Sequence, residues 1–192
     1  MNSKTKILFS GAIILFSGAI LTLCFTGIPA HAHTVNFSGK IISETCQIAD
    51  NSGNVDVNFG SVNMDTLKSH EQTTAQTPFQ IHLTGCPTAQ NVSIGLEGTP
   101  DTHAHGKADG VLAMNAGEGV AQGVGIEVYS SDDGSTQGTQ LTFDHQVKTT
   151  AKQADGNGDI TFDFLADLKS DSDVDVTAGN INATASIDIN YE

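Results

Sequence analysis

The chain has 192 residues, with 22 Asp and Glu against 8 Lys and no Arg, so its formal charge is −14 at pH 7. An acidic surface of this kind repels nucleic acid and anionic lipid, which argues against both as partners. The length suits one domain rather than two.

The first 32 residues have the features of a cleaved secretory signal. Lys4 and Lys6 precede an apolar run over residues 7–25, and the small-residue pattern Ala30-His31-Ala32 follows. We therefore predict cleavage after Ala32. A membrane anchor is the alternative, because the apolar run is nearly long enough to span a bilayer. The predicted mature chain keeps six lysines and all 22 carboxylates, a formal charge of −16.

Two cysteines, Cys46 and Cys86, remain in the predicted mature chain, since Cys24 lies in the signal. An exported protein with two cysteines most simply joins them in a disulfide. A metal or redox pair is the alternative, but the chain has no C-x-x-C spacing. We expect the disulfide.

Short β-rich stretches separated by turn signals make up the rest of the chain. No stretch keeps a helical apolar period for three turns, and residues 64–74 hold at most one short helical turn. Many short strands with frequent turns indicate a β-sandwich. The predicted strands are Val35–Ile42, Val55–Phe59, Phe79–Leu83, Val92–Leu96, Gly125–Tyr129, Gln140–Phe143, Ile160–Leu165 and Ile181–Tyr191.

The first predicted strand has a glycine in its middle. Val35, Phe37, Gly39 and Ile41 share one face of the strand. Glycine weakens a strand interior, so Gly39 indicates either a close approach to another backbone or a shallow pocket. An ordinary first strand with a bulge at Gly39 is the alternative.

The last predicted strand follows Gly179 and alternates strictly. We expect its outer edge to have no neighbour from this chain. Its polar face carries Asn, Thr, Ser and Asp, and its apolar face carries Ile181, Ala183, Ala185, Ile187, Ile189 and Tyr191.

Three other patterns bear on possible chemistry. Asp155-Gly-Asn-Gly-Asp159 begins like a calcium-binding loop. However, Ile160 stands at the sixth position, where such a loop has glycine, and Ala166 stands where it has a bidentate glutamate. A hairpin turn is therefore favoured. His103 and His105 would share a strand face but have no evident third ligand. No Gly-x-Ser-x-Gly motif is present. We therefore expect no catalytic residue, no metal and no cofactor, and hence no enzyme.

An ordered set of motifs resembles type 1-like fimbrial subunits of the chaperone–usher route, over essentially the whole mature chain. Gly179, fourteenth from the end, and the penultimate Tyr191 are its most specific members. The other motifs are Thr34-Val-Asn-Phe-Ser-Gly39, Val57-Asn-Phe-Gly60, Pro78–Cys86, Val124–Tyr129 and Ile160–Phe164.

The resemblance implies an all-β fold, an incomplete immunoglobulin-like β-sandwich lacking its final strand and completed by a donated strand. The signal peptide would span residues 1–32, the donor segment 33–42 and the pilin domain 43–192. Val35, Phe37, Gly39 and Ile41 would enter a neighbour's groove, and Cys46 would pair with Cys86. The acceptor groove and chaperone-binding strand would comprise Gly179, Ile181, Ala183, Ala185, Ile187, Ile189 and Tyr191.

The implied partners are identical or related pilin subunits, a periplasmic chaperone and an outer-membrane usher, with no nucleic acid. The implied location is the cell surface, reached through the periplasm. The function expected from this resemblance is a structural subunit of a surface fimbria that contributes to adhesion. Two alternatives remain at this point: a receptor- or glycan-binding tip or adaptor subunit, and a free-standing secreted β-sandwich.

Overall fold

The computed structural model describes residues 45–49, 53–103 and 110–192. The predicted signal peptide, the predicted donor segment and His105 lie outside these residues. The described part is all-β apart from the 3₁₀ turn η1 (Met64–Leu67) and Gly110, which is also assigned to a 3₁₀ turn. The strands are β1 (Gln47–Ile48), β2 (Thr77–Thr84), β3 (Asn91–Glu97), β4 (Leu112–Ala113), β5 (Val124–Ser131), β6 (Lys152–Gln153), β7 (Ile160–Ser170) and β8 (Ser186–Tyr191).

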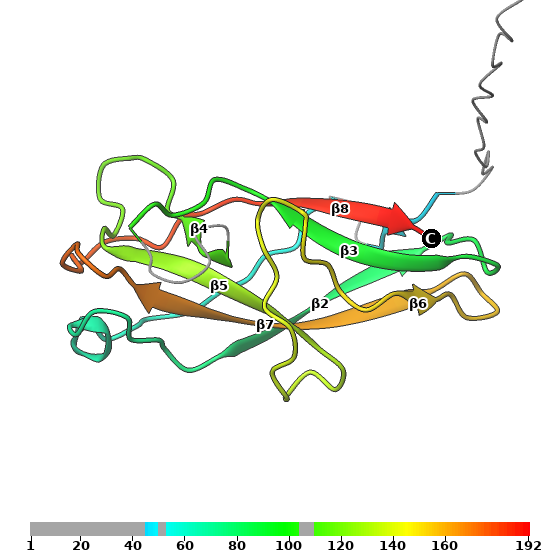
Figure 1. Cartoon of the computed structure of the whole chain (residues 1–192), viewed down its shortest axis with the longest axis horizontal. Coiled ribbons are helices and arrows are strands. Elements are labelled where there is room, and N and C mark those ends of the chain that lie inside the picture. Colours follow the sequence, from blue (N-terminus) through cyan, green and yellow to red (C-terminus); the bar gives the residue numbers. More distant parts are fainter. Residues whose placement is uncertain (1–44, 50–52, 104–109) are drawn as a thin grey trace, which may run out of the picture. The chain divides into compact units, whose positions relative to one another are not determined.

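The strands form two antiparallel sheets that lie as two layers (Figure 1). The larger sheet has the order β1-β2-β7-β5-β4, and the smaller has the order β6-β3-β8. In the larger sheet β7 is central, because β2 pairs along one of its edges and β5 along the other. In the smaller sheet β8 pairs with β3 alone among the described strands.

The alternation of β7 explains its central place. Every second residue from Ile160 to Leu168 is apolar and buried, so one face of the strand meets the other sheet. In the opposite sheet, β3 is buried from Val92 to Leu96 on both faces. Both stretches were predicted as strands, and both predictions are confirmed.

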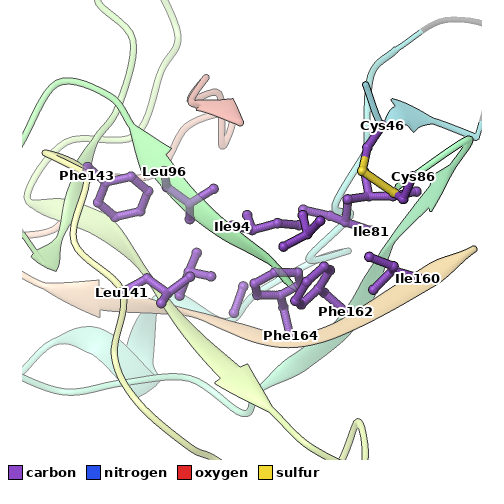
Figure 2. Packing of buried hydrophobic residues seen from close by; sticks show 14 of the residues in the cluster. Cys46, Ile81, Cys86, Ile94, Leu96, Leu141, Phe143, Ile160, Phe162 and Phe164 are labelled. Carbon is purple, nitrogen blue, oxygen red and sulfur yellow. A yellow bond between two sulfur atoms is a disulfide. The ribbon is translucent and has the colours of Figure 1, made fainter. Parts of the chain in front are cut away.

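The main core lies between the two layers and is dominated by aromatic and branched side chains (Figure 2). Phe162 and Phe164 of β7 are 1% and 0% exposed, and Ile94 of β3 is 0% exposed. The ring of Phe79 stacks on that of Phe164 with centroids 5.0 Å apart. Fully burying a side chain of this size is worth about 1.5–3 kcal/mol, so each of these residues contributes substantially to the domain's stability.

Two predicted strands are wrong as paired strands, and one is shorter than predicted. Residues 55–59 are extended but belong to neither sheet, and Gln140–Phe143 makes only a single bridge, from Gln140 to Tyr129. The ladder of the last strand begins at Ser186, not at Ile181. The single helical turn expected within residues 64–74 is confirmed as η1.

Candidate functional site

An open groove of about 690 Å³ lies beside the last strand. Residues 53–59 form one wall and residues 181–187 form the other. The floor is apolar and exposes the edge of the main core. Asp56 is the single titratable residue among those lining it in the described part of the chain. The floor residues are Phe79, Ile81, Leu96, Leu112, Ile126, Val128, Phe143 and Ala166.

The C-terminal wall alternates as the sequence predicts. From Ile181 to Ile189 each odd-numbered residue is half-buried and each even-numbered residue up to Asp188 is exposed. The half-buried set contains Ile181, Ala183, Ala185, Ile187 and Ile189, with Tyr191 after them. These side chains are thus neither in water nor fully covered by the described chain.

The main chain of this wall has one satisfied edge. Even-numbered residues face β3 or the loop before β5: Glu192 N–H donates to the Asn91 carbonyl (2.9 Å), and the Asn182 carbonyl accepts from Asn115 N–H (2.7 Å). Backbone groups of successive residues in a strand point to opposite edges. The odd-numbered residues 181–191 therefore direct their N–H and C=O groups to the groove side, where no described backbone group bonds them.

Residues 55–59 of the opposite wall also have backbone groups without a main-chain partner in the described chain. Val55, Val57 and Phe59 are half-buried while the residues between them are exposed, which is the alternation of a strand. No main-chain to main-chain hydrogen bond involves residues 55–62 within the described chain. The groove is therefore an apolar slot between residues 55–59 and residues 181–191. The groove-facing backbone groups of these two segments have no main-chain partner among the described residues, which is the arrangement that an added β-strand fits.

A second hollow of about 540 Å³ continues this slot and shares Val57, Phe59 and Ile181 with it. It is lined at its base by Leu67, Val124 and Leu168, the second apolar cluster of the domain. We call this region the Gly179 end of the groove, because Gly179 lies on its wall.

Gly179 is a glycine because of a close backbone approach. A Cβ at this position would lie 2.3 Å from the Ala121 nitrogen and 2.5 Å from the Val120 carbonyl carbon. Real Cβ atoms do not approach backbone atoms so closely, so any side chain would push the two segments apart. The sequence singled out Gly179 by its position alone, and the packing against residues 120–121 supplies the physical reason.

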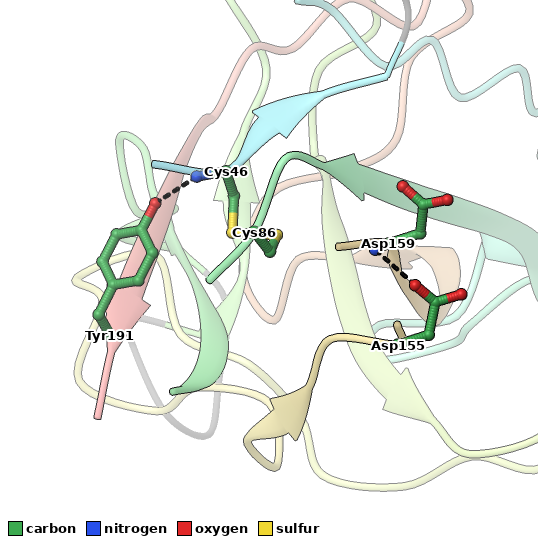
Figure 3. Close-up of a disulfide and its surroundings, with 5 residues drawn as sticks. All are labelled: Cys46, Cys86, Asp155, Asp159 and Tyr191. Atoms are coloured by element: carbon green, nitrogen blue, oxygen red, sulfur yellow. Dashed lines mark hydrogen bonds between the residues drawn. A yellow bond between two sulfur atoms is a disulfide. The ribbon is translucent and has the colours of Figure 1, made fainter. Parts of the chain in front are cut away.

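A disulfide and a tyrosine hold the C-terminal end of β8 near β1 (Figure 3). Cys46 and Cys86 are joined, with Cα atoms 4.3 Å apart, which confirms the predicted pairing. The Tyr191 hydroxyl accepts a hydrogen bond from the Cys46 N–H at 2.7 Å. The penultimate residue therefore ties β8 to the segment that leads into β1.

The Asp155–Asp159 segment is a tight turn, as predicted. The Asp155 carboxylate accepts backbone N–H groups from Asn157 (2.8 Å) and Asp159 (2.9 Å). These hydrogen bonds hold the pKa of Asp155 below its usual value, and the bond from Asp159 has the largest effect. The Gly158 carbonyl accepts from Cys86 N–H (2.9 Å), so the turn supports the disulfide.

The remaining chemical candidates do not assemble into a site. His103 Nδ1 lies 3.2 Å from an exposed Asp173 carboxylate. No group of three His, Cys, Asp or Glu side chains suited to a metal occurs in the described ranges. No helix of the described residues is both long and apolar enough to cross a membrane.

Sequence reasoning missed the wall formed by Val55, Val57 and Phe59 as part of the site. Their alternation predicted a strand, and nothing in it indicated that the strand would lack a neighbour. The described groove walls thus include the predicted acceptor residues from Gly179 to Ile187 together with this second segment.

The comparisons with known proteins agree on one family. The family model described as "Fimbrial protein" matches residues 35–192. The fimbrial-like protein YfcP of Escherichia coli K12 is 30% identical over 95% of this chain and 96% of its own length. The type-1 fimbrial protein A chain of Salmonella typhi is 27% identical over 98% of this chain and 100% of its own.

Solved structures show the same fold at low sequence identity. The P pilus rod subunit PapA superposes with a TM-score of 0.60 at 20% identity, covering 77% of this chain and 99% of that one. A subunit from a chaperone–usher pilus structure also has a TM-score of 0.60, at 21% identity, covering 86% and 98%. The fold is the incomplete immunoglobulin-like sandwich of chaperone–usher pilus subunits.

Proposed function

Because this chain belongs to the fimbrial protein family, as a structural subunit of a surface pilus, we propose that it polymerises by donor-strand exchange. One observation carries this proposal: the open groove is apolar and is flanked by two extended segments whose backbone edges have no described partner. A strand placed there would bond both edges and cover the core.

The proposed donor is the segment 33–42 of a second copy. As an extended strand, this segment would place Val35, Phe37 and Ile41 on one face, with Gly39 between Phe37 and Ile41. Burial of the three apolar side chains is worth roughly 1.5–3 kcal/mol each, a large share of a typical domain stability of about 5–15 kcal/mol. Gly39 would allow a close backbone approach where the groove is shallow.

The proposed acceptor is the face that begins after Gly179. Its odd-numbered residues from Ile181 to Ile187 line the slot, and the odd-numbered residues up to Tyr191 direct backbone groups to the same edge, so one donated strand would satisfy both. The acceptor residues are Gly179, Ile181, Ala183, Ala185, Ile187, Ile189 and Tyr191.

An unfilled groove of this kind is an aggregation hazard, because it combines exposed apolar surface with an unpaired edge. We therefore propose that a periplasmic chaperone fills the groove during export and that an outer-membrane usher exchanges it for the next subunit's donor. Cleavage after Ala32 would free the donor segment. This route delivers the subunit to the cell surface.

The groove supports assembly rather than catalysis. Among the described residues lining it, Asp56 is the single group that titrates, so no acid–base pair is available there. The fimbrial family is a structural one, and we propose that this chain has no enzymatic activity.

The test compares two substitutions on adjacent residues of the C-terminal wall. Both residues border the groove, but Ala185 packs against the apolar core, whereas Ser186 is exposed. We expect Ala185→Arg to abolish incorporation into fibres and binding of a Val35–Ile42 peptide. Ser186→Arg, which adds the same charge one residue away, should leave both intact. Fibres are read by electron microscopy and peptide binding by calorimetry.

Circular dichroism of both variants controls for folding. If Ala185→Arg folds, binds the peptide and enters fibres as the parent does, the groove is not the assembly site. Equal loss in both variants would also contradict the proposal, because only Ala185 packs against the apolar core that a donated strand would cover.

A further inference from the structure

Two buried carboxyl groups meet beside the Gly179 end of the groove. Asp101 and Asp171 are 7% and 3% exposed. Both line one hollow, which shares Ala121 and Val124 with the Gly179 end of the groove. Asp171 Oδ1 has no hydrogen-bond partner within the described structure, and the Asp101 carboxyl contributes to raising the pKa of Asp171. Asp101 Oδ1 accepts the His103 backbone N–H at 2.8 Å.

Among the described residues, no lysine pairs with these two carboxyl groups. The titratable groups facing Asp171 are Asp101, His103 and Asp173, and His70 places its Nδ1 3.0 Å from the Asp171 main-chain oxygen. Two carboxylates that are close and buried cannot both ionise without a large cost. A single proton held between them removes the repulsion and gives the orphan oxygen a partner.

The pair is mechanically connected to the groove. Asp171 N–H donates to the Gly123 carbonyl at 2.9 Å. A Cβ on Gly123 would lie 2.5 Å from the Asp175 carbonyl oxygen, so the two segments pack backbone to backbone. Gly123 belongs to the segment 119–123, which is also hydrogen-bonded to residues 177–180, just before the C-terminal wall of the groove.

Three main-chain hydrogen bonds make that second connection. Thr177 N–H donates to Gln122 (3.0 Å), Asn180 N–H donates to Gly119 (2.7 Å), and Ala121 N–H donates to Asn180 (3.0 Å). Residues 119–123 therefore link the carboxyl pair on one side to Gly179 and its neighbours on the other. Anything that separates Asp101 from Asp171 loosens the segment on which Gly179 packs.

We propose that Asp101 and Asp171 share one proton and act as a proton-dependent clamp on the Gly179 end of the groove. With the proton present the pair holds residues 119–123 in place. Loss of the proton sets two buried carboxylates against each other and favours local opening of residues 119–123 and 177–180. The consequence for fibre assembly rests on the proposed donor-strand function, whereas the clamp itself does not.

The transition falls in an accessible pH range. Burial, and next the Asp101 carboxylate, raises the pKa of Asp171 to about 6. An open form with an ordinary aspartate pKa of about 3.9 binds the proton less tightly. The clamp is therefore closed in mild acid and weakens as the pH rises through 6.

Hydrogen exchange on the exported chain tests the clamp without any donor strand. We expect the local opening constant to rise about tenfold between pH 5 and pH 7, after correction for intrinsic exchange. The reporting amides are Ala121, Asp171, Thr177 and Asn180. Cys86 N–H, bonded to the Gly158 carbonyl at the disulfide end, serves as the internal control and should show no such change.

Three variants make the result specific. Asp171→Asn and Asp101→Asn each remove the shared proton while keeping a hydrogen-bonding side chain, and each should flatten the pH dependence at the reporting amides. Asp173→Asn alters an exposed carboxylate of the same loop and should keep it. The clamp would be overturned if the opening constant at the reporting amides of the parent did not change with pH. It would also be overturned if Asp171→Asn and Asp101→Asn both kept the parent's pH dependence. Because the readout is local, failure of donor-strand exchange would not alter it.

Discussion

β7 and β8 have the same kind of alternating sequence but opposite surroundings. β7 pairs with β2 on one edge and β5 on the other, and its inward residues are almost fully buried. β8 pairs with β3 alone among the described strands, and its inward residues are only half-buried. Alternation therefore decides which face of a strand meets the core, while the number of neighbours decides how much stability that face supplies.

The difference locates an incompletely covered apolar face along β8 in the part of the chain that the structure describes. The residues along β7 are already covered, so a partner adds nothing to them. The residues along β8 and along 55–59 face a common slot, and their full contribution depends on what fills it.

The largest expected contrast comes from one truncation in each region. Phe164→Ala should cost about 3–5 kcal/mol whether the groove is empty or filled, because Phe164 is 0% exposed in the chain alone. Ile187→Ala should cost clearly less in the empty subunit and rise toward about 2–5 kcal/mol once a donor strand is bound. Urea unfolding of both variants, with and without the Val35–Ile42 peptide, measures this. Equal costs for Ile187→Ala in the two states would erase the contrast.

A smaller effect concerns pH and the outer face of the larger sheet. Burial, and next the Glu127 carboxylate directly across the ladder, raises the pKa of Asp167 to about 6. The folded state then binds a proton more tightly than the unfolded state. This contribution to stability is complete below about pH 4 and is lost as the pH rises through about 6.

Asp167→Asn should therefore reduce the fall in Tm between pH 5 and pH 7.5, by about 2–4 °C for each kcal/mol removed. Asp163→Asn, on the same face of β7 but only half-buried, is the matched control and should keep the parent's pH profile. Thermal melts at the two pH values measure the effect. An unchanged profile in Asp167→Asn would show that this carboxyl is not the group responsible.

Most of the fold could be predicted from sequence, where alternation and burial coincide. β2, β3, β5 and β7 each have a clear apolar period, and each was predicted. β4 and β6 have two residues apiece, too few to show a period. Residues 55–59 alternate like a strand yet have no pairing partner in the described chain. The sequence could not predict this, because a side-chain period contains no information about the backbone edge.

The site was predictable in part for the same reason. The face from Ile181 to Tyr191 and the residue Gly179 were found from their pattern and from the resemblance. The carboxyl pair of Asp101 and Asp171 was not, because the two residues are far apart in sequence and meet only through the fold. The donor segment stays a prediction, since it lies outside the described residues.

Calorimetric melting of residues 43–192, with and without a synthetic Val35–Ile42 peptide, tests the central claim most directly. The account predicts a large rise in Tm with the peptide, and little or none with the same peptide carrying Phe37→Asp. A domain that melts at the same high temperature with either peptide, or with none, would contradict it.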